Sequence, residues 1–328
     1  MDNQLTGKIF DIDGAGAFDR LAMEVFRFQY SHNDVYRQFC DALERPPSKV
    51  GGLADIPFLP VELFKQHRVV SYRGEAAIVF SSSGTSGTET SRHYVKDLSV
   101  YRRSFTEGFR YFYGEPANYC ILALLPSYLE RDDASLVYMA RGLMDQSAHP
   151  DNGFYLEDMR GLHEKLVRLS DQGQPTLLLG VTFALLDLAE AHPTKMRNVV
   201  VMETGGMKGR RKEMVREELH ALLKQAFGVE TIHSEYGMTE LLSQAYSKAN
   251  GLFACPPWMK VLTRDSNDPL TMTEGCRTGG INIIDLANIF SCSFLSTQDL
   301  GKMHADGRFE VLGRFDNSDV RGCNLMVG

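Results

Sequence analysis

The sequence predicts an α/β protein, built on mostly parallel sheets flanked by helices with a β-rich C-terminal part. Two features predict this class. Short apolar runs that suit buried parallel strands alternate with segments of helical periodicity up to about residue 250. After an apolar strand at residues 76–80, these runs cover residues 119–125, 176–180, 198–202 and 229–233. Beyond them only strand-like runs follow, at residues 259–262, 280–284, 294–296 and 309–312.

The spacing of apolar residues predicts the helices. One or two amphipathic helices are expected between Phe18 and Leu43. Asp97 is a suitable N-cap for a helix to Tyr113, because aromatic residues recur along one of its faces. Further helices are expected at residues 132–146, 158–169, 183–191 and 208–226.

The change of pattern near Asn250 predicts two parts. Residues 1–250 are expected to form the α/β core with its N-terminal helices. Residues 251–328 are expected to form a β-rich subdomain. A chain of 328 residues is long enough to bury a large core in either arrangement.

The composition excludes several classes of protein. The apolar fraction of 43% and charged fraction of 23% are ordinary for a globular chain, and the net charge of −7 argues against a nucleic-acid partner. No basic segment followed by an apolar run opens the chain, and no apolar run is long enough to span a bilayer. The six cysteines form no C-x-x-C pair, which predicts reduced thiols and a cytoplasmic location.

A loop rich in serine and glycine (residues 81–88, SSSGTSGT) follows the first apolar run. Glycines allow consecutive backbone N–H groups to point at an anion, and the hydroxyl groups add neutral donors. The loop lacks the G-x-x-x-x-G-K-[ST] pattern of a Walker loop. Phosphate binding and an ordinary solvated turn both fit it.

Two later clusters carry other useful groups. In the YGMTE segment (residues 236–240), a tyrosine can stack on a purine, and Glu240 offers a hard oxygen ligand for Mg²⁺. In the segment 296–301 (STQDLG), Asp299 can accept hydrogen bonds from both hydroxyl groups of a ribose. Each cluster alone also fits an ordinary turn.

Together the clusters resemble the adenylate-forming enzymes, the superfamily of acyl-CoA synthetases, firefly luciferase and peptide-synthetase adenylation domains. The Ser/Gly loop resembles the phosphate loop of that superfamily, and the YGMTE segment resembles its Y-G-x-T-E motif. Asp299 stands where its ribose-binding aspartate stands, and residues 313–316 (GRFD) resemble its hinge. The segments 91–93, 125–129, 203–209 and 320–325 are similar to those of the acyl-protein synthetase branch, the LuxE type.

The chain departs from the superfamily in two places. The Pro-Lys that usually ends the phosphate loop is replaced by Glu89 and Thr90, so Arg92, His93 or Lys96 would supply positive charge. The sequence stops at Gly328, soon after the hinge, so we expect the small C-terminal domain of the larger enzymes to be absent. This fits an acyl-protein synthetase, in which an enzyme cysteine takes the acyl group.

The resemblance implies an enzyme of the acid–thiol ligase type, which uses ATP and Mg²⁺ to activate a carboxylic acid, a fatty acid above all, as an acyl adenylate. The acyl group would pass to an enzyme thiol, an acyl acceptor or a reductase protein. Cys323 is the implied nucleophile, with Arg92 and His93 as charge partners, and Glu240 is the implied metal ligand. The implied ATP-binding residues are Ser82, Ser83, Gly84, Thr85, Ser86, Gly87, Gly205, Gly206, Tyr236, Gly237, Thr239, Asp299 and Arg314.

Two alternatives remain open at this point. One is a truncated ligase of an aryl or short-chain acid that acylates CoA or a carrier protein. The other is a catalytically silent nucleotide-binding subunit, which the missing Pro-Lys favours and the intact YGMTE segment disfavours. For Cys323 a buried structural thiol is as good an interpretation as a nucleophile. The sequence leaves the identity of the acid and the oligomeric state undetermined.

Overall fold

The computed structural model describes residues 2–82, 90–125, 133–156, 158–206, 214–273 and 275–315. The chain divides into two units. The first unit joins Met1–Glu75 to Pro257–Gly328, and the second is the continuous segment Ala76–Pro256. The predicted change of pattern near residue 250 lies close to Pro257. The N-terminal helices, which the sequence grouped with the α/β core, belong to the unit of the C-terminal strands.

The main sheet of the second unit has the strand order β5-β4-β6-β7-β8-β9-β10. Neighbours from β5 to β8 are parallel, whereas β9 and β10 are antiparallel to theirs. Every residue of β4 and β6 is buried, as the continuous apolar runs predicted. The bounds are β4 (Cys120–Leu124), β5 (Gly153–Tyr155), β6 (Thr176–Val181), β7 (Val199–Thr204), β8 (His233–Tyr236), β9 (Ala245–Ser247) and β10 (Leu252–Ala254).

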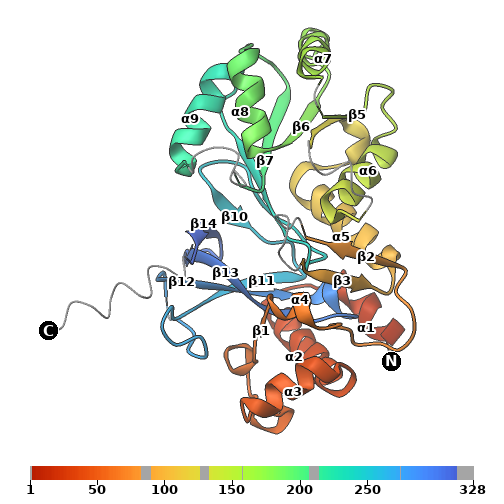
Figure 1. Ribbon diagram of the computed structural model, residues 1–328, viewed down its shortest axis with the longest axis vertical. Coiled ribbons are helices and arrows are strands. Elements are labelled where there is room, and N and C mark those ends of the chain that lie inside the picture. Colours follow the sequence, from red (N-terminus) through yellow and green to blue (C-terminus); the bar gives the residue numbers. More distant parts are fainter. Residues whose placement is uncertain are drawn as a thin grey trace, which may run out of the picture. The chain divides into compact units, whose positions relative to one another are not determined.

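Helices connect the parallel strands, which confirms the predicted α/β class. Helices α8 and α9 pack against each other, and so do α5 and α6 (Figure 1). The helices of this unit are α5 (Leu98–Tyr113), α6 (Ser135–Ser147), α7 (Met159–Asp171), α8 (Thr182–Ala191) and α9 (Arg216–Phe227), with a 3-10 turn at Pro116–Asn118.

Helix α5 begins at the predicted cap. The side chain of Asp97 accepts a hydrogen bond from the backbone N–H of Ser99 (2.8 Å). The predicted aromatic face is buried at Tyr101, Phe105 and Phe109. A Cβ atom at Gly142 of α6 would lie 2.5 Å from the ring of Phe105, so a glycine lets the two helices approach closely.

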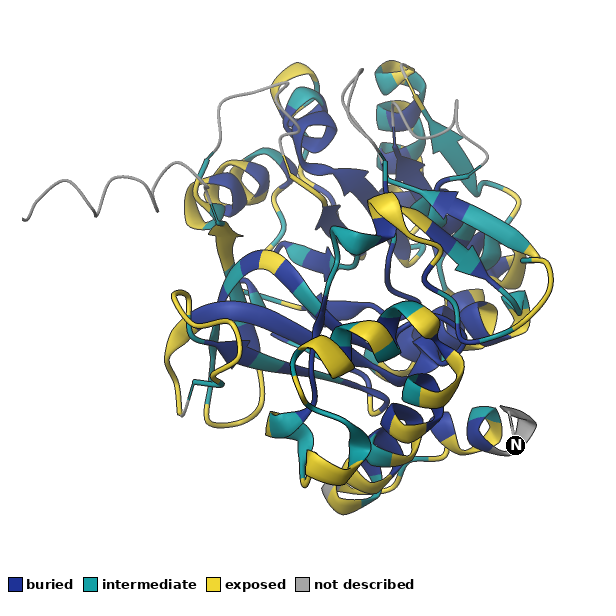
Figure 2. Ribbon diagram, turned by 60° about the horizontal axis from the view of Figure 1, so that its bottom comes forward, coloured by how far each residue is buried: buried dark blue, intermediate teal, exposed yellow. Residues whose placement is uncertain are grey.

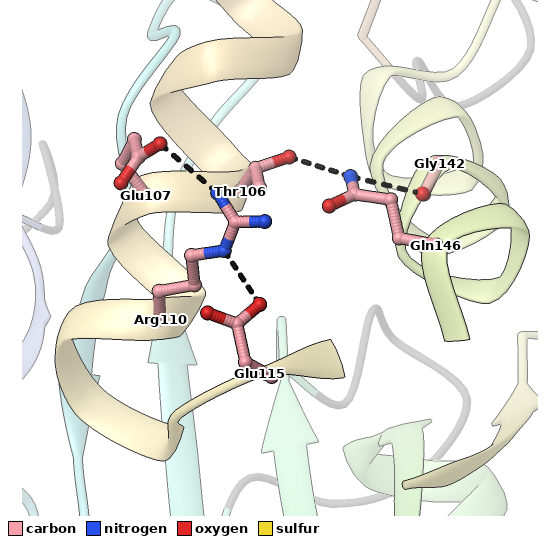
Figure 3. Close-up of polar contacts among 6 residues, drawn as sticks. All are labelled: Thr106, Glu107, Arg110, Glu115, Gly142 and Gln146. Atoms are coloured by element: carbon pink, nitrogen blue, oxygen red, sulfur yellow. Dashed lines mark hydrogen bonds and ion pairs between the residues drawn. The ribbon is translucent and has the colours of Figure 1, made fainter. Parts of the chain in front are cut away.

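Polar contacts hold the outer side of the same helix (Figure 3). Gln146 of α6 donates from Nε2 to the hydroxyl group of Thr106 (2.6 Å), which links the two helices. Arg110 pairs with Glu107 and, past the end of the helix, with Glu115. These ion pairs are largely exposed, so we expect each to contribute less than about 1 kcal/mol to stability.

The first predicted strand lies outside the parallel sheet. Strands β2 (Ile78–Ser81) and β3 (Arg92–Val95) form a separate antiparallel pair, with Ser81 opposite Arg92. The strand expected at residues 76–80 is confirmed as β2, but its partner is β3 and not one of the parallel strands. The short segment between the two strands lets the chain fold back on itself, whereas a parallel neighbour needs a longer crossover.

The strands of the first unit form an antiparallel arrangement in the order β11-β12-β13-β14. β1 runs parallel to the first half of β13, and β14 pairs with its second half. The bounds are β1 (Leu59–Pro60), β11 (Met259–Arg264), β12 (Thr278–Asp285), β13 (Phe294–Met303) and β14 (Phe309–Arg314).

The N-terminal helices pack in this unit through one core. The rings of Phe26, Tyr36 and Phe58 surround Phe294 of β13. Buried Gln29 hydrogen-bonds the backbone of Ser293 (2.9 Å). Figure 2 shows strands mostly buried and helices exposed on their outer faces. The helices are α1 (Asp2–Ile9), α2 (Ala15–His32), α3 (Asp34–Ala42) and α4 (Leu63–Gln66), with 3-10 turns at Pro47–Lys49, Leu53–Asp55 and Leu286–Asn288.

Several predicted boundaries were wrong by a few residues. The strand expected at 229–233 is β8, at His233–Tyr236, because α9 ends at Phe227 with Gly228 (φ 64°) as its C-cap and a connection follows. The strand expected at 294–296 continues to Met303, since β12 and β14 pair with its polar second half. Of the helix expected at residues 208–226, α9 covers Arg216–Phe227, while residues 208–213 lie outside the described part of the chain. In the described part of the chain, no helix has the length and apolar character that crossing a membrane requires.

Candidate active site

The glycine turn (Gly205 and Gly206) and the YGMTE segment begin at the ends of neighbouring parallel strands. Residues 202–204 of β7 pair in register with residues 233–235 of β8. Both segments therefore leave the sheet at its carboxyl edge, where ligands bind in open α/β sheets. Gly205 adopts φ 65°, which a glycine permits without strain and which turns the chain directly after the strand.

A buried hydrogen bond joins these two strand ends. The hydroxyl group of Thr204 donates to Oε2 of Glu235, its partner in the parallel register. Both side chains are buried. Burial raises the pKa of Glu235 to about 7, and the nearby carboxylate of Glu203 adds to the effect, while the bond from Thr204 opposes it. This carboxyl group therefore changes its protonation state close to neutral pH.

A second buried carboxylate holds the glycine turn through a hydroxyl group. Glu203 accepts from Thr182 Oγ1 (3.2 Å), and the same hydroxyl group lies 2.8 Å from the carbonyl oxygen of Gly205. On its other side, Glu203 Oε1 lies 3.6 Å from both Arg216 Nε and His220 Nε2 of α9. The start of α8, the start of α9 and the glycine turn are thus linked through one side chain.

The hairpin that flanks the Ser/Gly loop is tied to the YGMTE segment. Nδ1 of buried His93 donates to the carbonyl oxygen of Thr239 (2.8 Å). At the start of the loop, the backbone N–H of Ser91 donates to the hydroxyl group of Ser82 (2.9 Å). Arg92 is exposed next to His93. The predicted phosphate-binding residues Ser83, Gly84, Thr85, Ser86 and Gly87 lie outside the described residues.

The side chains of the YGMTE segment differ in exposure. The ring of Tyr236 is half-buried and packs edge-on against Phe253 (5.9 Å between ring centroids). Glu240 is 7% exposed. Among the described residues, no three His, Cys, Asp or Glu side chains form a group that could hold a metal ion.

In the first unit, Asp299 and Arg314 lie opposite each other on β13 and β14. Arg314 Nε is 3.5 Å from Asp299 Oδ1, and the arginine side chain is 81% exposed. The sequence placed Asp299 at the end of a strand, but it lies within β13. Its backbone N–H donates to the hydroxyl group of Thr297 (3.1 Å), near a shift in the pairing register.

A buried guanidinium group supports this part of β13. Arg264 of β11 donates to the carbonyl oxygens of Ile281 (2.7 Å) and Thr297 (2.6 Å) and to the side chain of Asn282 (2.8 Å). A Cβ atom at Gly280 would lie 2.5 Å from the guanidinium carbon. Arg264 thus links three strands within two residues of Asp299.

Comparison with known proteins identifies the family. Residues 15–328 match the family described as "Acyl-protein synthetase, LuxE". The chain belongs to this family. A curated relative from Vibrio harveyi, named long-chain-fatty-acid–luciferin-component ligase, is 24% identical over 332 residues, which cover 94% of this chain and 86% of the relative. A relative of the same name from Photorhabdus luminescens is 33% identical over 72 residues, or 22% of this chain and 61% of the relative.

Solved structures show that this LuxE-family chain has the fold of larger adenylate-forming enzymes. It aligns with 2-hydroxyisobutyryl-CoA ligase in complex with 2-HIB-AMP and CoA at a TM-score of 0.70 and 13% identity, covering 92% of this chain and 71% of that one. It aligns with ATP-bound MatB from Rhodopseudomonas palustris at a TM-score of 0.56 and 16% identity, covering 74% and 49%. The chain thus spans about half the length of the MatB structure.

The cysteines described for this LuxE-family chain are poor candidates for a nucleophile where they are buried. Burial raises the pKa of Cys40 to about 12 and that of Cys120 to about 11, and it also raises the pKa of Cys292. Cys255 is partly exposed and Cys276 is exposed. Cys323 lies outside the described residues, so its role stays a prediction.

Sequence reasoning missed the residues that support the predicted ones. Glu203 opens the segment 203–209 and Glu235 directly precedes the YGMTE segment, but neither was given a role. Arg264, Thr182 and His220 were not singled out at all. One signal was available for Glu203, because it directly follows the apolar run 198–202. A charged residue at a buried strand end needs a specific partner. The partners come from distant segments, which no local pattern reveals.

Proposed function

We propose that this chain activates a long-chain fatty acid with ATP and passes the acyl group to a thiol. The observation that carries the proposal is the match to the acyl-protein synthetase family over residues 15–328. The Vibrio harveyi relative, which is matched over 94% of this chain, is named as a ligase of long-chain fatty acids. The fold, shared with enzymes solved with ATP or an acyl adenylate, supports the same chemistry.

The reaction has two half-reactions. In the first, a carboxylate oxygen attacks the α-phosphorus of ATP, and the bond between the α-phosphorus and the bridging oxygen breaks. Acyl adenylate and pyrophosphate result. In the second, a thiolate attacks the acyl carbon, and AMP leaves with the bonding electron pair. Phosphoryl transfer of this kind depends on positioning and charge neutralisation more than on covalent help from the protein.

The proposed ATP-binding groups are those of the sequence motifs, taken for each unit by itself. In the second unit, the glycine turn and Tyr236 would hold the adenine, and Thr239 would contact a phosphate oxygen. Residues 82–87 would line the phosphates, and Gly237 belongs to the turn that carries Tyr236 and Thr239. In the first unit, Asp299 and Arg314 would hold the ribose. The adjacent strand ends of β7 and β8 support the grouping in the second unit.

The positive charge near the phosphates is assigned to Arg92 rather than to His93. Arg92 is exposed at the end of the β2–β3 pair. His93 is buried, and its Nδ1 is bound to the backbone of Thr239, so it acts by positioning that segment. This assignment offers a replacement for the lysine that usually ends the phosphate loop.

The residues present fit a magnesium ion that enters with ATP. Mg²⁺ in such sites commonly takes one or two protein carboxylates, together with substrate phosphates and water. Glu240 is the carboxylate of the YGMTE segment, and no described cluster could hold a metal by itself. When bound, the ion would neutralise phosphate charge, while Glu240 would fix its position.

Cys323 is the proposed thiol of the second half-reaction. Thiolates are strong nucleophiles, and thioesters keep the acyl group reactive for transfer to a reductase protein or another acceptor. The remaining cysteines described as free are consistent with a cytoplasmic setting, where thiols stay reduced.

The test is exchange of labelled pyrophosphate into ATP, measured with fatty acids of different length. The proposal predicts exchange that requires the acid and Mg²⁺, and that is fastest with long chains. It also predicts an acyl adduct on the wild-type protein that Cys323→Ser lacks, with exchange retained in the variant. ATP binding without exchange for any acid would instead indicate a silent nucleotide-binding subunit.

A further inference from the structure

We infer that Glu235 is a positioning residue for the nucleotide, because its buried carboxyl group locks together the glycine turn and the YGMTE segment. This inference rests on the proposed function and adds a residue to the same site. Glu235 directly precedes the YGMTE segment, and the sequence motifs give it no role of its own. The argument comes from where its two carboxyl oxygens lie.

The first oxygen ties the two strand ends. Thr204 is the last residue of β7 and immediately precedes Gly205, while Glu235 immediately precedes Tyr236. The two are register partners, and the hydroxyl group of Thr204 donates to Oε2 of Glu235. Each partner is thus one residue from the segment that it controls. The bond therefore holds the glycine turn and Tyr236 at a fixed distance from each other.

The second oxygen lies against the turn after Tyr236. A Cβ atom at Gly237 would be 2.5 Å from Oε1 of Glu235 and 3.4 Å from Cγ of Gln244. The glycine therefore leaves room for the carboxyl group beneath the turn. The side chain of Glu235 therefore occupies the space that a side chain at position 237 would need, and Tyr236 is the residue between the two.

A carboxyl group at this position is costly, which indicates a role beyond packing. Glu235 is 7% exposed, and its partner across the β8–β9 pair is the buried Tyr246. Tyr246 and Tyr113 face it, and the carboxylate of Glu203 lies close enough to raise its pKa. An apolar side chain would fill such a space at lower free energy. Local rules of folding are broken in this way mostly at functional sites.

The experiment measures ATP affinity in variants of the full chain. Thr204→Val and Glu235→Ala each remove the bond, and we expect each to raise the Kd for ATP–Mg²⁺ about tenfold in calorimetric titration. The variant that combines Thr204→Val with Glu235→Ala should have a Kd for ATP no higher than that of the weaker-binding single variant, because both substitutions remove the same hydrogen bond. Glu235→Gln keeps an acceptor for Thr204, so its Kd should stay within about threefold of the wild-type value.

Gly237→Ala adds a second, independent arm. Alone, it should weaken ATP binding, because its methyl group meets the carboxyl group of Glu235. Combined with Glu235→Ala, which removes the obstacle, it should add little further loss. If Glu235 had no positioning role, the double variant would instead bind ATP as tightly as the wild type, because the steric obstacle is gone.

Thr176→Val is the matched control. Thr176 is also buried, and its hydroxyl group donates to the carbonyl oxygen of Gln174 (3.0 Å), but it lies at the first residue of β6, at the opposite edge of the sheet. It should cost comparable stability and leave the Kd for ATP unchanged. In the pyrophosphate exchange assay, Thr204→Val and Glu235→Ala should each raise the KM for ATP. The KM for the fatty acid should stay within about twofold of the wild-type value.

The outcomes separate the inference from the proposed function. If Thr204→Val and Glu235→Ala fold and bind ATP as tightly as the wild type, or raise both KM values equally, Glu235 has no positioning role. If Glu235→Ala does not fold, the Kd for ATP of Thr204→Val is compared with that of Thr204→Ser, which keeps the hydroxyl donor. Equal values for these two variants would likewise show that the bond to Glu235 has no positioning role. A wild-type chain that binds ATP but exchanges no pyrophosphate contradicts the proposed function, while the Kd comparison still decides the inference.

Discussion

The two units bury opposite charges beside their proposed nucleotide-binding residues. The second unit buries the carboxyl groups of Glu203 and Glu235 at the ends of parallel strands. Hydrogen bonds to these groups position the loops that follow the strands. The first unit buries the guanidinium group of Arg264, which holds strands. A buried carboxyl group can take up a proton, whereas a guanidinium group keeps its charge at any ordinary pH.

The site residues are held differently as a consequence. In the second unit, Gly205 and Tyr236 follow the strands and depend on a few side-chain hydrogen bonds for their spacing. In the first unit, Asp299 and Arg314 lie on paired strands, where the backbone ladder fixes their separation. Substitutions near the loops should therefore alter binding more than folding, and substitutions beneath the strands should alter folding first.

The largest expected effect is that of Arg264→Met. The variant keeps most of the volume but leaves the carbonyl oxygens of Ile281 and Thr297 without their donor. We expect the free energy of unfolding to fall by about 3–5 kcal/mol, measured by urea unfolding. Arg277→Met is the control, because this arginine is exposed, and it should change stability by less than about 0.5 kcal/mol. Equal changes in the free energy of unfolding for the two variants would show that the hydrogen bonds of Arg264 do not stabilise the fold.

A pair of glycine substitutions should come next. A Cβ atom at Gly279 would lie 2.2 Å from the backbone carbonyl oxygen of Arg264, which has no freedom to move aside. At Gly237 the obstacle is a side-chain oxygen of Glu235, which can rotate. Gly279→Ala should therefore cost about 3 kcal/mol of stability and Gly237→Ala about 1 kcal/mol, by urea unfolding. The reverse order would contradict the contrast between strands and loops.

The pH dependence of stability should distinguish the two buried charges. The pKa of Glu235 rises from 4.5 to about 7 on folding, so the folded chain holds this proton more tightly than the unfolded chain. The stabilisation that comes from this tighter proton binding is fully present below pH 4.5, and it is lost as the pH rises through about 7. Relative to Glu235→Gln, the wild type should lose about 3 kcal/mol across that window.

Urea unfolding of both proteins at about pH 5 and pH 8 checks this prediction. Burial lowers the pKa of nearby His233 to about 4, which works in the opposite direction, but it is present in both proteins and cancels in their difference. A difference that is the same at both pH values would show that Glu235 does not titrate with folding.

The smallest expected effect on stability is that of Arg314→Ala. The ion pair with Asp299 spans 3.5 Å, and the arginine side chain is 81% exposed. We expect its loss to change the free energy of unfolding by less than about 1 kcal/mol, by urea unfolding. If Arg314 contacts the ribose, the same variant should weaken ATP binding several-fold. A large loss of stability would instead make this pair part of the fold.

The sequence predicted the α/β class and most elements, because apolar runs and helical spacing record burial directly. Asp97 was identified as a cap for the same local reason. The sequence did not predict that β2 pairs with β3, or that β13 continues past Ser296, since polar strands are recognised only through their neighbours. The motifs indicated Tyr236 and Asp299, whereas the ties made by Glu235 and Arg264 depend on long-range contacts.

The most direct test of the central claim is hydrogen–deuterium exchange of the full chain with and without a non-hydrolysable acyl adenylate analogue. The account predicts slower exchange in the segments that begin at Gly205 and Tyr236 of the second unit, and around Asp299 of the first. It predicts a smaller effect at Gly205 and Tyr236 in Thr204→Val. Tight binding that protects neither the glycine turn nor the YGMTE segment would contradict the assignment of the site.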